Sequence, residues 1–196
     1  MQDATTTSKD FVLFAKRSMR ILIEDALAEF PTTEKIIDTP CEQRFHGRCS
    51  PQPEHICAVS IVRSGDALVE VVREVEPGIR VGKILIQRNE SIPEKPAELF
   101  YTKLPKEIAT MHVLLCDPML ATGGSALKAI ETLMDHGVKP SKIVFANMIC
   151  APEGLKVLAQ SYPMIKIVTV CVDRHLNGDK YIVPGLGDYG DRFFNT

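Results

Sequence analysis

The sequence has no run of about 18 apolar residues, which excludes a membrane-spanning helix. Its first residues, MQDATTTSKD, lack the charged and apolar regions of a signal peptide, so we expect a cytoplasmic protein. It also lacks an excess of either charge, because 23 Lys and Arg stand against 25 Asp and Glu. Wrapping of DNA or RNA needs a basic face. We therefore expect neither a nucleic-acid nor a membrane partner, and we favour small molecules as ligands.

What is present is the composition of an ordinary globular protein of 196 residues, 45% of them hydrophobic and 24% charged. This length predicts one domain. The six cysteines could form disulfides in a secreted chain. Four of them, however, lie in or beside apolar strand-like runs, where a reduced cysteine is a small core hydrophobe. These four are Cys57, Cys116, Cys150 and Cys171. We therefore expect reduced thiols.

A zinc site is an alternative use of cysteine in one irregular stretch. Cys41, His46, Cys49 and His55 are zinc-capable ligands that lie close together in the sequence. Their spacing, C-x4-H-x2-C-x5-H, is not a usual zinc pattern. Zinc therefore stays a minor alternative.

The apolar pattern indicates an α/β fold. Residues 10–30 predict an amphipathic helix that Pro31 ends, and residues 31–55, rich in proline and turn formers, predict an irregular excursion or a short hairpin. Strand-like and helix-like pieces then alternate. The expected strands are 56–62, 80–87, 111–116, 143–149 and 165–172, and the expected helices are 67–75, 124–136 and 152–160. Near-continuous apolar strands separated by helices predict a parallel sheet flanked by helices.

The stretch MHVLLCDPMLATGGSALKAI, residues 111–130, places irregular backbone between a strand and a helix. Glycines allow close approach of a ligand, the free N–H groups of the first helical turn point at it, and the helix dipole favours negative charge. Residues 121–125, ATGGS, therefore predict a phosphate cradle to which Thr122 and Ser125 add hydroxyl donors. Neither GxxxxGK[ST] nor GxGxxG is present, so neither an ATPase nor a dinucleotide binder follows. Asp117, directly after the strand, can bond hydroxyls of the same ligand, which suggests a sugar phosphate.

Residues 117–125, DPMLATGGS, resemble the phosphoribosyl pyrophosphate (PRPP) motif of the uracil phosphoribosyltransferases. The general phosphoribosyltransferase pattern has two adjacent acids before the loop; here the second is Pro118, as in the uracil branch. The resemblance extends from about residue 10 to the C-terminus and is strongest to eukaryotic-type members. It implies a single type I phosphoribosyltransferase domain over 1–196 that transfers phosphoribose from PRPP to N1 of uracil, giving UMP and pyrophosphate in pyrimidine salvage. It also implies Mg²⁺ carried mainly by PRPP, a homodimer or homotetramer, and GTP as a candidate activator.

Two arginines at strand ends match family residues that hold pyrophosphate: Arg63 in VSIVRSGDA and Arg88 in ILIQRNE. A guanidinium suits this role because it binds phosphate bidentately. Taken alone, Arg63 is more often a surface salt-bridge former. Ser64 stands where the family usually has alanine, and we expect this difference to have only a modest effect on pyrophosphate binding. The resemblance implies catalytic roles for Asp117, Asp188, Arg63 and Arg88. The implied PRPP-binding set is Arg63, Arg88, Asp117, Pro118, Met119, Leu120, Ala121, Thr122, Gly123, Gly124, Ser125 and Asp188.

The C-terminal stretch YIVPGLGDYGDRFF, residues 181–194, can wrap backbone donors and acceptors around a flat ring; a plain loop is the alternative. The resemblance makes 173–196 the uracil-binding segment. It implies that main-chain groups of Ile182, Gly187 and Tyr189 read the base, while Asp188 at the same site faces the donor. Such groups reject cytosine, since a buried mismatch leaves polar groups unpaired.

Residues 88–107, RNESIPEKPAELFYTKLPKE, contain three prolines and no helical stripe, and so long a loop is usually functional. By resemblance they form a mobile hood whose closure excludes water. We also expect residues 1–9 to be disordered.

The rival functions are a phosphoribosyltransferase for another base and, from another class, a non-catalytic PRPP sensor or an RNA-binding regulator on the same fold. The near-neutral charge speaks against RNA, and the intact motifs speak against lost catalysis.

Overall fold

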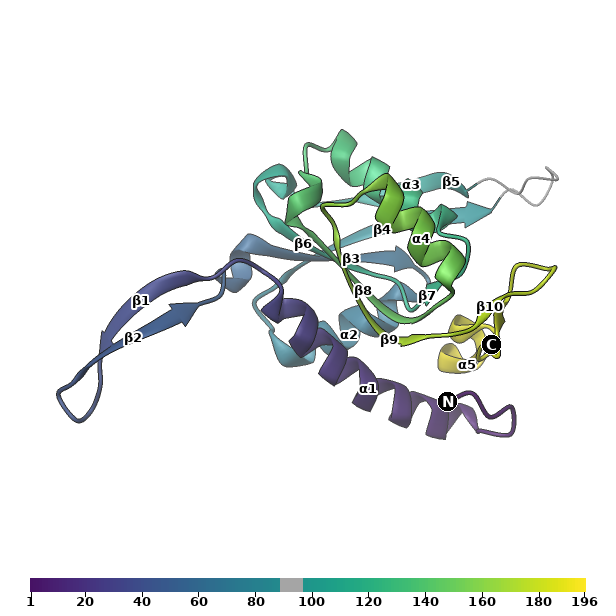
Figure 1. Cartoon of the computed structure of the whole chain (residues 1–196), viewed down its shortest axis with the longest axis horizontal. Coiled ribbons are helices and arrows are strands. Elements are labelled where there is room, and N and C mark those ends of the chain that lie inside the picture. The colour runs from purple at the N-terminus through teal and green to yellow at the C-terminus, as the bar shows by residue number, and fades with distance from the viewer. Residues whose placement is uncertain (89–96) are drawn as a thin grey trace.

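The computed structural model describes residues 1–88 and 97–196, and of Arg88 it describes the backbone only. The chain forms a central sheet covered by helices, from which a two-stranded hairpin projects (Figure 1). The expected α/β class is therefore confirmed. No helix among the described residues is long and apolar enough to cross a bilayer.

The central sheet contains, in the described part of the chain, β3 Ile56–Val62, β4 Arg80–Arg88, β5 Ala97–Lys103, β6 His112–Cys116, β7 Met119–Leu120, β8 Ile143–Cys150 and β9 Lys166–Val172. The strands follow the order β5-β4-β3-β6-β8, and both β7 and β9 pair with β8. The described pairings are parallel except that of β4 with β5. β3, β6 and β8 are buried along nearly their whole length, as expected for strands covered on both faces.

Within residues 1–88 and 97–196, four helices cover the two faces of this sheet: α1 Ser8–Ala28, α2 Gly65–Val75, α3 Gly124–Asp135 and α4 Pro152–Ser161. α1 and α2 pack on one face in an apolar cluster that includes Phe11 and Leu68. α3 and α4 contribute to a second cluster, which includes Leu133 and Leu158, on the other face. Burial of these apolar side chains is the main favourable term in folding. The predicted strands and helices therefore exist, with ends shifted by no more than two residues.

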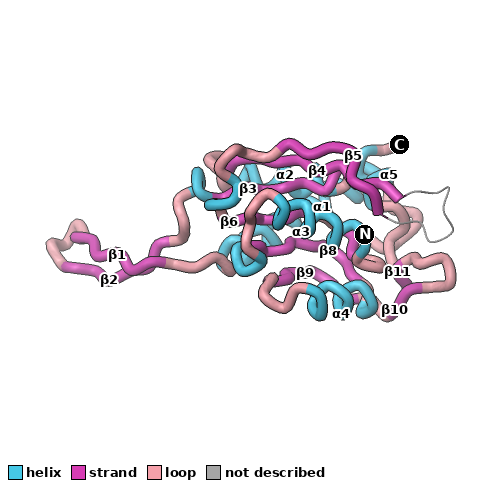
Figure 2. Tube along the Cα trace, turned by 90° about the horizontal axis from the view of Figure 1, so that it is seen from above, coloured by secondary structure: helices cyan, strands magenta, loops and turns pink. Residues whose placement is uncertain are grey.

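For residues 31–55 the sequence predicted either an irregular excursion or a short hairpin, and the structure shows the hairpin. β1 Thr33–Asp38 and β2 Arg44–Cys49 pair antiparallel and project from the body (Figures 1 and 2). Ile36 and Phe45 are exposed on it. The remaining described elements are η1 Pro53–His55, η2 Ile108–Thr110, η3 Pro140–Lys142, β10 His175–Leu176, β11 Ile182–Val183 and α5 Tyr189–Phe194.

The expectation that residues 1–9 are disordered is wrong. The Thr7 side chain caps α1 by accepting from the N–H of Asp10, so that the helix begins at Ser8. Arg192 donates to the carbonyl oxygens of Met1 and Asp3 at 2.6 and 2.8 Å. This arginine anchors the N-terminal residues to the other end of the chain, and the two termini lie near each other in Figure 1.

The expectation of a loop over 88–107 is wrong for its second half. Residues 97–103 form β5, an antiparallel strand at the edge of the sheet beside β4. Pro105 lies outside this strand, where its missing N–H group interrupts no ladder. The rest of the predicted hood, residues 89–96, lies outside the described residues.

All six cysteines are free, as expected. Cys57, Cys116 and Cys150 are buried in the core strands. Cys171 is exposed because its strand, β9, pairs only with β8 in the described sheet, and the interpretation of Cys171 as a core residue is wrong.

Candidate active site

A cleft of about 1340 Å³ lies at the carboxyl ends of the parallel strands. Its wall includes Ser64 after β3, Gln87 near the end of β4, and Asp117 after β6. Ligands of open α/β sheets bind at this edge. The other lining residues are Ala97, Met119, Leu120, Ala121, Thr122, Gly123, Gly124, Ser125, Ala126, Gly178, Asp179, Lys180, Tyr181, Ile182, Gly187, Asp188 and Tyr189. The cleft therefore unites the predicted phosphate cradle with the predicted base segment.

The phosphate cradle has the geometry that an anion needs. Gly123 precedes α3 with φ 88°, a left-handed conformation that glycine adopts without strain, and no side chain caps this helix. The carbonyl of Gly123 accepts the N–H of Leu127 at 2.9 Å, while the N–H groups of the first turn have no partner within the helix. These N–H groups and the positive end of the helix dipole favour a phosphate at residues 121–125.

Asp117 is held at the cleft by the middle of β8. Its N–H donates to the carbonyl of Ala146 at 3.3 Å, and its own carbonyl accepts from Asn147 Nδ2 at 3.0 Å. Thr169 in turn donates to Asn147 Oδ1 at 2.9 Å. This support by the buried Asn147 could not be predicted from local sequence, because it depends on strands that are distant in the chain.

Pro118 takes no direct part in the cleft lining. Its carbonyl accepts the N–H groups of Met148 and Ile149, at 3.2 and 3.0 Å, and so joins the turn to β8. Met119 and Leu120 follow as β7, also paired with β8. Pro118 thus shapes the turn, and its predicted contact with the donor stays a prediction.

Arg63 follows β3, and its guanidinium contacts the C-terminal segment. Nη2 donates to Asp191 Oδ1 at 2.5 Å, and Nη1 donates to Thr196 Oγ1 at 3.0 Å. The neighbouring Ser64 lines the cleft, so Arg63, the residue before it, lies at the margin of the cleft. Arg88 is the last residue of β4, and its side chain lies outside the described residues.

The base segment presents its backbone to the cleft. Ile182, Gly187 and Tyr189 line it, but the ring of Tyr189 is 1% exposed and packs between Phe11 and Phe193, with centroids 5.3 and 5.8 Å away. Burial raises the pKa of the Tyr189 phenol. The ring therefore belongs to the core, and main-chain groups are what Tyr189 offers to a ligand.

Asp188 is exposed at the start of α5 and lines the cleft. Its Oδ1 accepts the N–H of Asp191 at 2.9 Å, which makes it the N-cap of this short helix. This hydrogen bond restrains the carboxylate of a residue that lines the cleft.

The structure adds lining residues that the motif reading missed. Residues 178–181 form part of the wall, and the turn-forming sequence Asn177-Gly178-Asp179 was the signal that could have drawn attention to them. Gln87 and Ala97, from the facing strands β4 and β5, close another part. Nothing in the local sequence marked these two.

In the described part of the chain, no group of three or more His, Cys, Asp or Glu gathers to hold a metal ion. The candidate zinc ligands of residues 41–55 therefore do not converge. Asp117 and Asp188 do line the same cleft. Two carboxylates suit Mg²⁺, which proteins usually bind through one or two carboxylates together with substrate phosphates.

Comparison with known proteins agrees with this geometry. A model of the uracil phosphoribosyltransferase family matches residues 1–196. The chain is 43% identical over 196 residues to a uracil phosphoribosyltransferase of Saccharomyces cerevisiae, covering 99% of this chain and 88% of the relative. It is 44% identical over 198 residues to that of Dictyostelium discoideum, covering 100% and 89%. Among solved structures, a protein from Aquifex aeolicus aligns with a TM-score of 0.83 and 31% identity, covering 98% of this chain and 89% of that chain.

Proposed function

The chain belongs to the uracil phosphoribosyltransferase family, and we propose that the cleft is where PRPP and uracil meet. Its activity is that of the family: a glycosyltransferase that converts uracil and PRPP into UMP and pyrophosphate in pyrimidine salvage. This proposal rests on one observation: residues 119–125 of the phosphate cradle and residues 187–189 of the base segment line the same cleft. In this proposal residues 1–196 act as one phosphoribosyltransferase domain, with 173–196 as the uracil-binding segment.

The donor is held along its length by three groups of residues. The 5′-phosphate accepts from the first-turn N–H groups of α3 and from the hydroxyls of Thr122 and Ser125. The carboxylate of Asp117 accepts from the ribose hydroxyls. Arg63 and Arg88 bind the pyrophosphate, to which guanidinium groups can donate bidentately.

The reaction is a displacement at the anomeric carbon. The bond from C1′ to the pyrophosphate oxygen breaks and its electron pair leaves with pyrophosphate. N1 of uracil forms the new bond to C1′ through an oxocarbenium-like state and gives up its proton to Asp188 or to water. Arg63 and Arg88 stabilise the negative charge that grows on the leaving group. The carboxylates of Asp117 and Asp188 would help to hold a Mg²⁺ ion carried by PRPP, and such an ion would neutralise part of that charge. The cleft walls reduce the access of water, the competing nucleophile.

The base is read by the main chain of the C-terminal segment. The side chain of Tyr189 is buried in the core, which supports recognition through backbone groups at Ile182, Gly187 and Tyr189. Backbone donors and acceptors cannot rotate to suit another base. Cytosine, whose amino group donates where O4 of uracil accepts, leaves a buried polar group unpaired there.

Asp188 has one of two roles in this proposal: it positions the metal shell, or it takes the N1 proton of uracil as a general base. Asp188→Asn isolates its charge, because asparagine is an equally good N-cap and preserves α5. We expect kcat to fall steeply with an unchanged melting temperature. An unchanged kcat would exclude both roles.

The donor assignment is tested by Asp117→Asn, which keeps the Oδ1 that accepts from the N–H of Met119 at 3.4 Å but loses the carboxylate. A hydrogen bond to a charged group is worth about 1.5–3 kcal/mol, so we expect kcat/KM for PRPP to fall roughly ten- to a hundred-fold. Asp135→Asn, an exposed site at the end of α3, is the matched control. An Asp117→Asn enzyme with the kcat/KM of this control would refute the assignment.

We further propose that the protein assembles as a homodimer or homotetramer. Leu13, Phe14 and Ile21 of α1 and Val170 of β9 are exposed around an apolar groove of about 920 Å³. Such contiguous apolar surface is typical of interfaces between subunits. Sedimentation equilibrium measures the assembly directly, and a monomer at micromolar concentration would contradict the proposal.

GTP activation and a cytoplasmic location are two further proposals. The resemblance to eukaryotic-type members supports GTP as an activator, and initial rates with and without GTP decide the matter. Six free cysteines support a reducing compartment. Fractionation of cells that produce the tagged full chain tests the location.

A further inference from the structure

The guanidinium of Arg63 takes part in a closed set of contacts with two residues of the C-terminal segment. It donates to Asp191 and to Thr196, at 2.5 and 3.0 Å. Thr196 Oγ1 also donates to Asp191 Oδ1, at 3.1 Å. The ring of Phe194 lies 5.6 Å from Cζ of Arg63. Three side chains of this segment therefore surround one strand-end arginine.

This contact depends on a glycine in the first turn of α5. A Cβ atom on Gly190 would lie 2.9 Å from Ser64 Oγ and 3.0 Å from Arg63 Nη2. The first distance is shorter than Cβ atoms show and the second is tight, so a larger residue would displace the Ser64 hydroxyl and the tip of the Arg63 side chain. The sequence thus lets the two turns approach closely.

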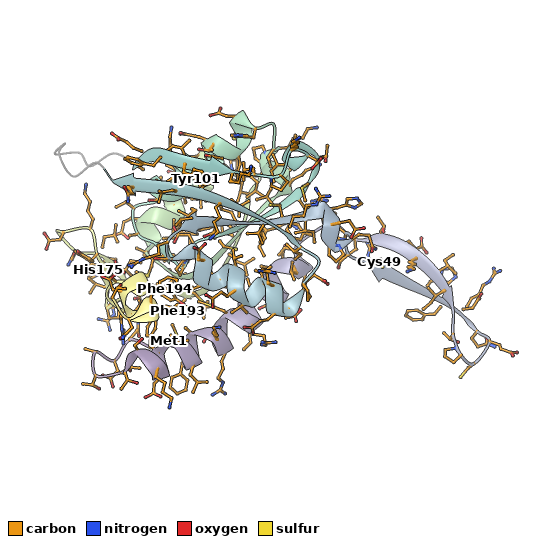
Figure 3. The ribbon with its side chains drawn as sticks, turned by 180° about the vertical axis from the view of Figure 1, so that it is seen from behind. Met1, Cys49, Tyr101, His175, Phe193 and Phe194 are labelled. Carbon is orange, nitrogen blue, oxygen red and sulfur yellow. The ribbon has the colours of Figure 1, made fainter. Side chains whose placement is uncertain are left out.

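A purely stabilising role for the Arg63–Asp191 pair is a poor explanation. The side chains are 48% and 54% exposed, and exposed ion pairs contribute little to stability. α5 is anchored separately: the rings of Tyr189 and Phe193 pack in the core, and Arg192 donates to the carbonyl of Leu186 at 2.8 Å. Figure 3 shows Phe193 on this segment, near Met1.

Orientation of the guanidinium is the better explanation. An arginine side chain free in solvent samples many rotamers, and fixing it on binding costs entropy. Asp191 and Thr196 fix both terminal nitrogens, using one N–H of each. A guanidinium carries five N–H donors in a rigid fork, so donors remain for a phosphate while the fork is already held. The guanidinium contact lowers the pKa of Asp191, which is therefore ionised at neutral pH.

We propose that Asp191, assisted by Thr196, is a positioning residue that orients the Arg63 guanidinium for the pyrophosphate of PRPP. The proposal rests on the proposed donor role of Arg63. It makes α5 a shared support, since the helix carries both the Tyr189 backbone at the base site and the carboxylate that holds Arg63 at the donor site.

A double-mutant cycle tests this proposal. The variants are Asp191→Ala, Arg63→Ala and the double variant, and Asp135→Ala is the control for loss of an exposed helical aspartate. PRPP affinity is measured by calorimetry, and uracil KM and melting temperature are measured alongside. We expect Asp191→Ala to weaken PRPP binding about five-fold, or roughly 1 kcal/mol, with uracil KM and melting temperature as in the control. In the Arg63→Ala background the same change should have no further effect.

The outcomes separate the inference from the function on which it rests. An equal loss of PRPP affinity in both backgrounds would mean that Asp191 acts without Arg63, and would overturn the inference. So would unchanged PRPP binding in Asp191→Ala when Arg63→Ala weakens it. If Arg63→Ala itself binds PRPP as well as the unmodified protein, the donor role of Arg63 fails, and the positioning role fails with it.

Discussion

Asp173 offers a strong test of how the base segment is held in place. Its carboxylate is 8% exposed, and Oδ2 accepts the N–H of Gly185 at 2.8 Å. Gln2 Nε2 lies 3.3 Å from both oxygens. Gly185 lies between Ile182 and Gly187, which line the cleft. Asp173 therefore ties the base-reading loop to the end of β9 and to the N-terminal residues.

The expected cost of Asp173→Asn follows from these contacts. Asparagine keeps one acceptor oxygen for the Gly185 N–H, but its neutral amide replaces the charged oxygen that accepts from Gln2 Nε2. Because hydrogen bonds to charged groups are the stronger ones, we expect this loss to cost about 1–3 kcal/mol. In a protein of this size 1 kcal/mol shifts the melting temperature by about 2–4 °C, so the variant should melt about 2–12 °C lower.

Calorimetric melting and steady-state kinetics together measure the effect. We expect uracil KM to rise in Asp173→Asn while PRPP KM stays near that of the Asp135→Asn control, because the cradle at residues 121–125 does not contact Asp173. A variant with unchanged melting temperature and unchanged uracil KM would refute the claim that this carboxylate holds the loop.

Two further predictions concern the core. Tyr189→Phe should keep stability and uracil KM, because the Tyr189 hydroxyl makes only a weak 3.9 Å contact with the Met19 sulfur; Tyr189→Ala should lose about 3–5 kcal/mol by opening a cavity, and a urea titration distinguishes them. A large loss in the phenylalanine variant would contradict this. Burial raises the pKa of the Cys57 thiol from its ordinary value of 9.0 to about 12. The unfolded thiol then ionises first, so this residue's contribution to stability is complete below pH 9 and is lost as the pH rises toward 12. Cys57→Ala should flatten the decline in the free energy of unfolding between those pH values, and an unchanged slope would exclude the effect.

Most of the sheet could be predicted because its strands carry their own signal. Strands buried on both faces are continuous apolar runs, which local sequence reveals. β5 was missed because only part of each residue's surface is covered at a sheet edge, so its apolar pattern is weak between flanking prolines. The ordered conformation of residues 1–7 could not be predicted, because it depends on hydrogen bonds from Arg192, at the opposite end of the chain.

The functional site, like the fold, could be predicted only in part from local sequence. The phosphate cradle is contiguous in sequence, so residues 121–125 could be recognised as one unit. The supports of the site are contacts between distant segments: Asn147 behind Asp117, Asp173 behind Gly185, and Asp191 beside Arg63. No local pattern encodes such pairs. The salt bridge that Arg63 suggested when taken alone is present, and we propose that it serves the donor role rather than replacing it.

The most direct test of the proposed function is UMP formation from uracil and PRPP with Mg²⁺, with cytosine, orotate and hypoxanthine as parallel acceptors. We expect turnover of uracil and negligible turnover of the other three bases. Turnover of another base at a comparable kcat/KM, or no turnover of any base by protein that binds PRPP, would contradict it.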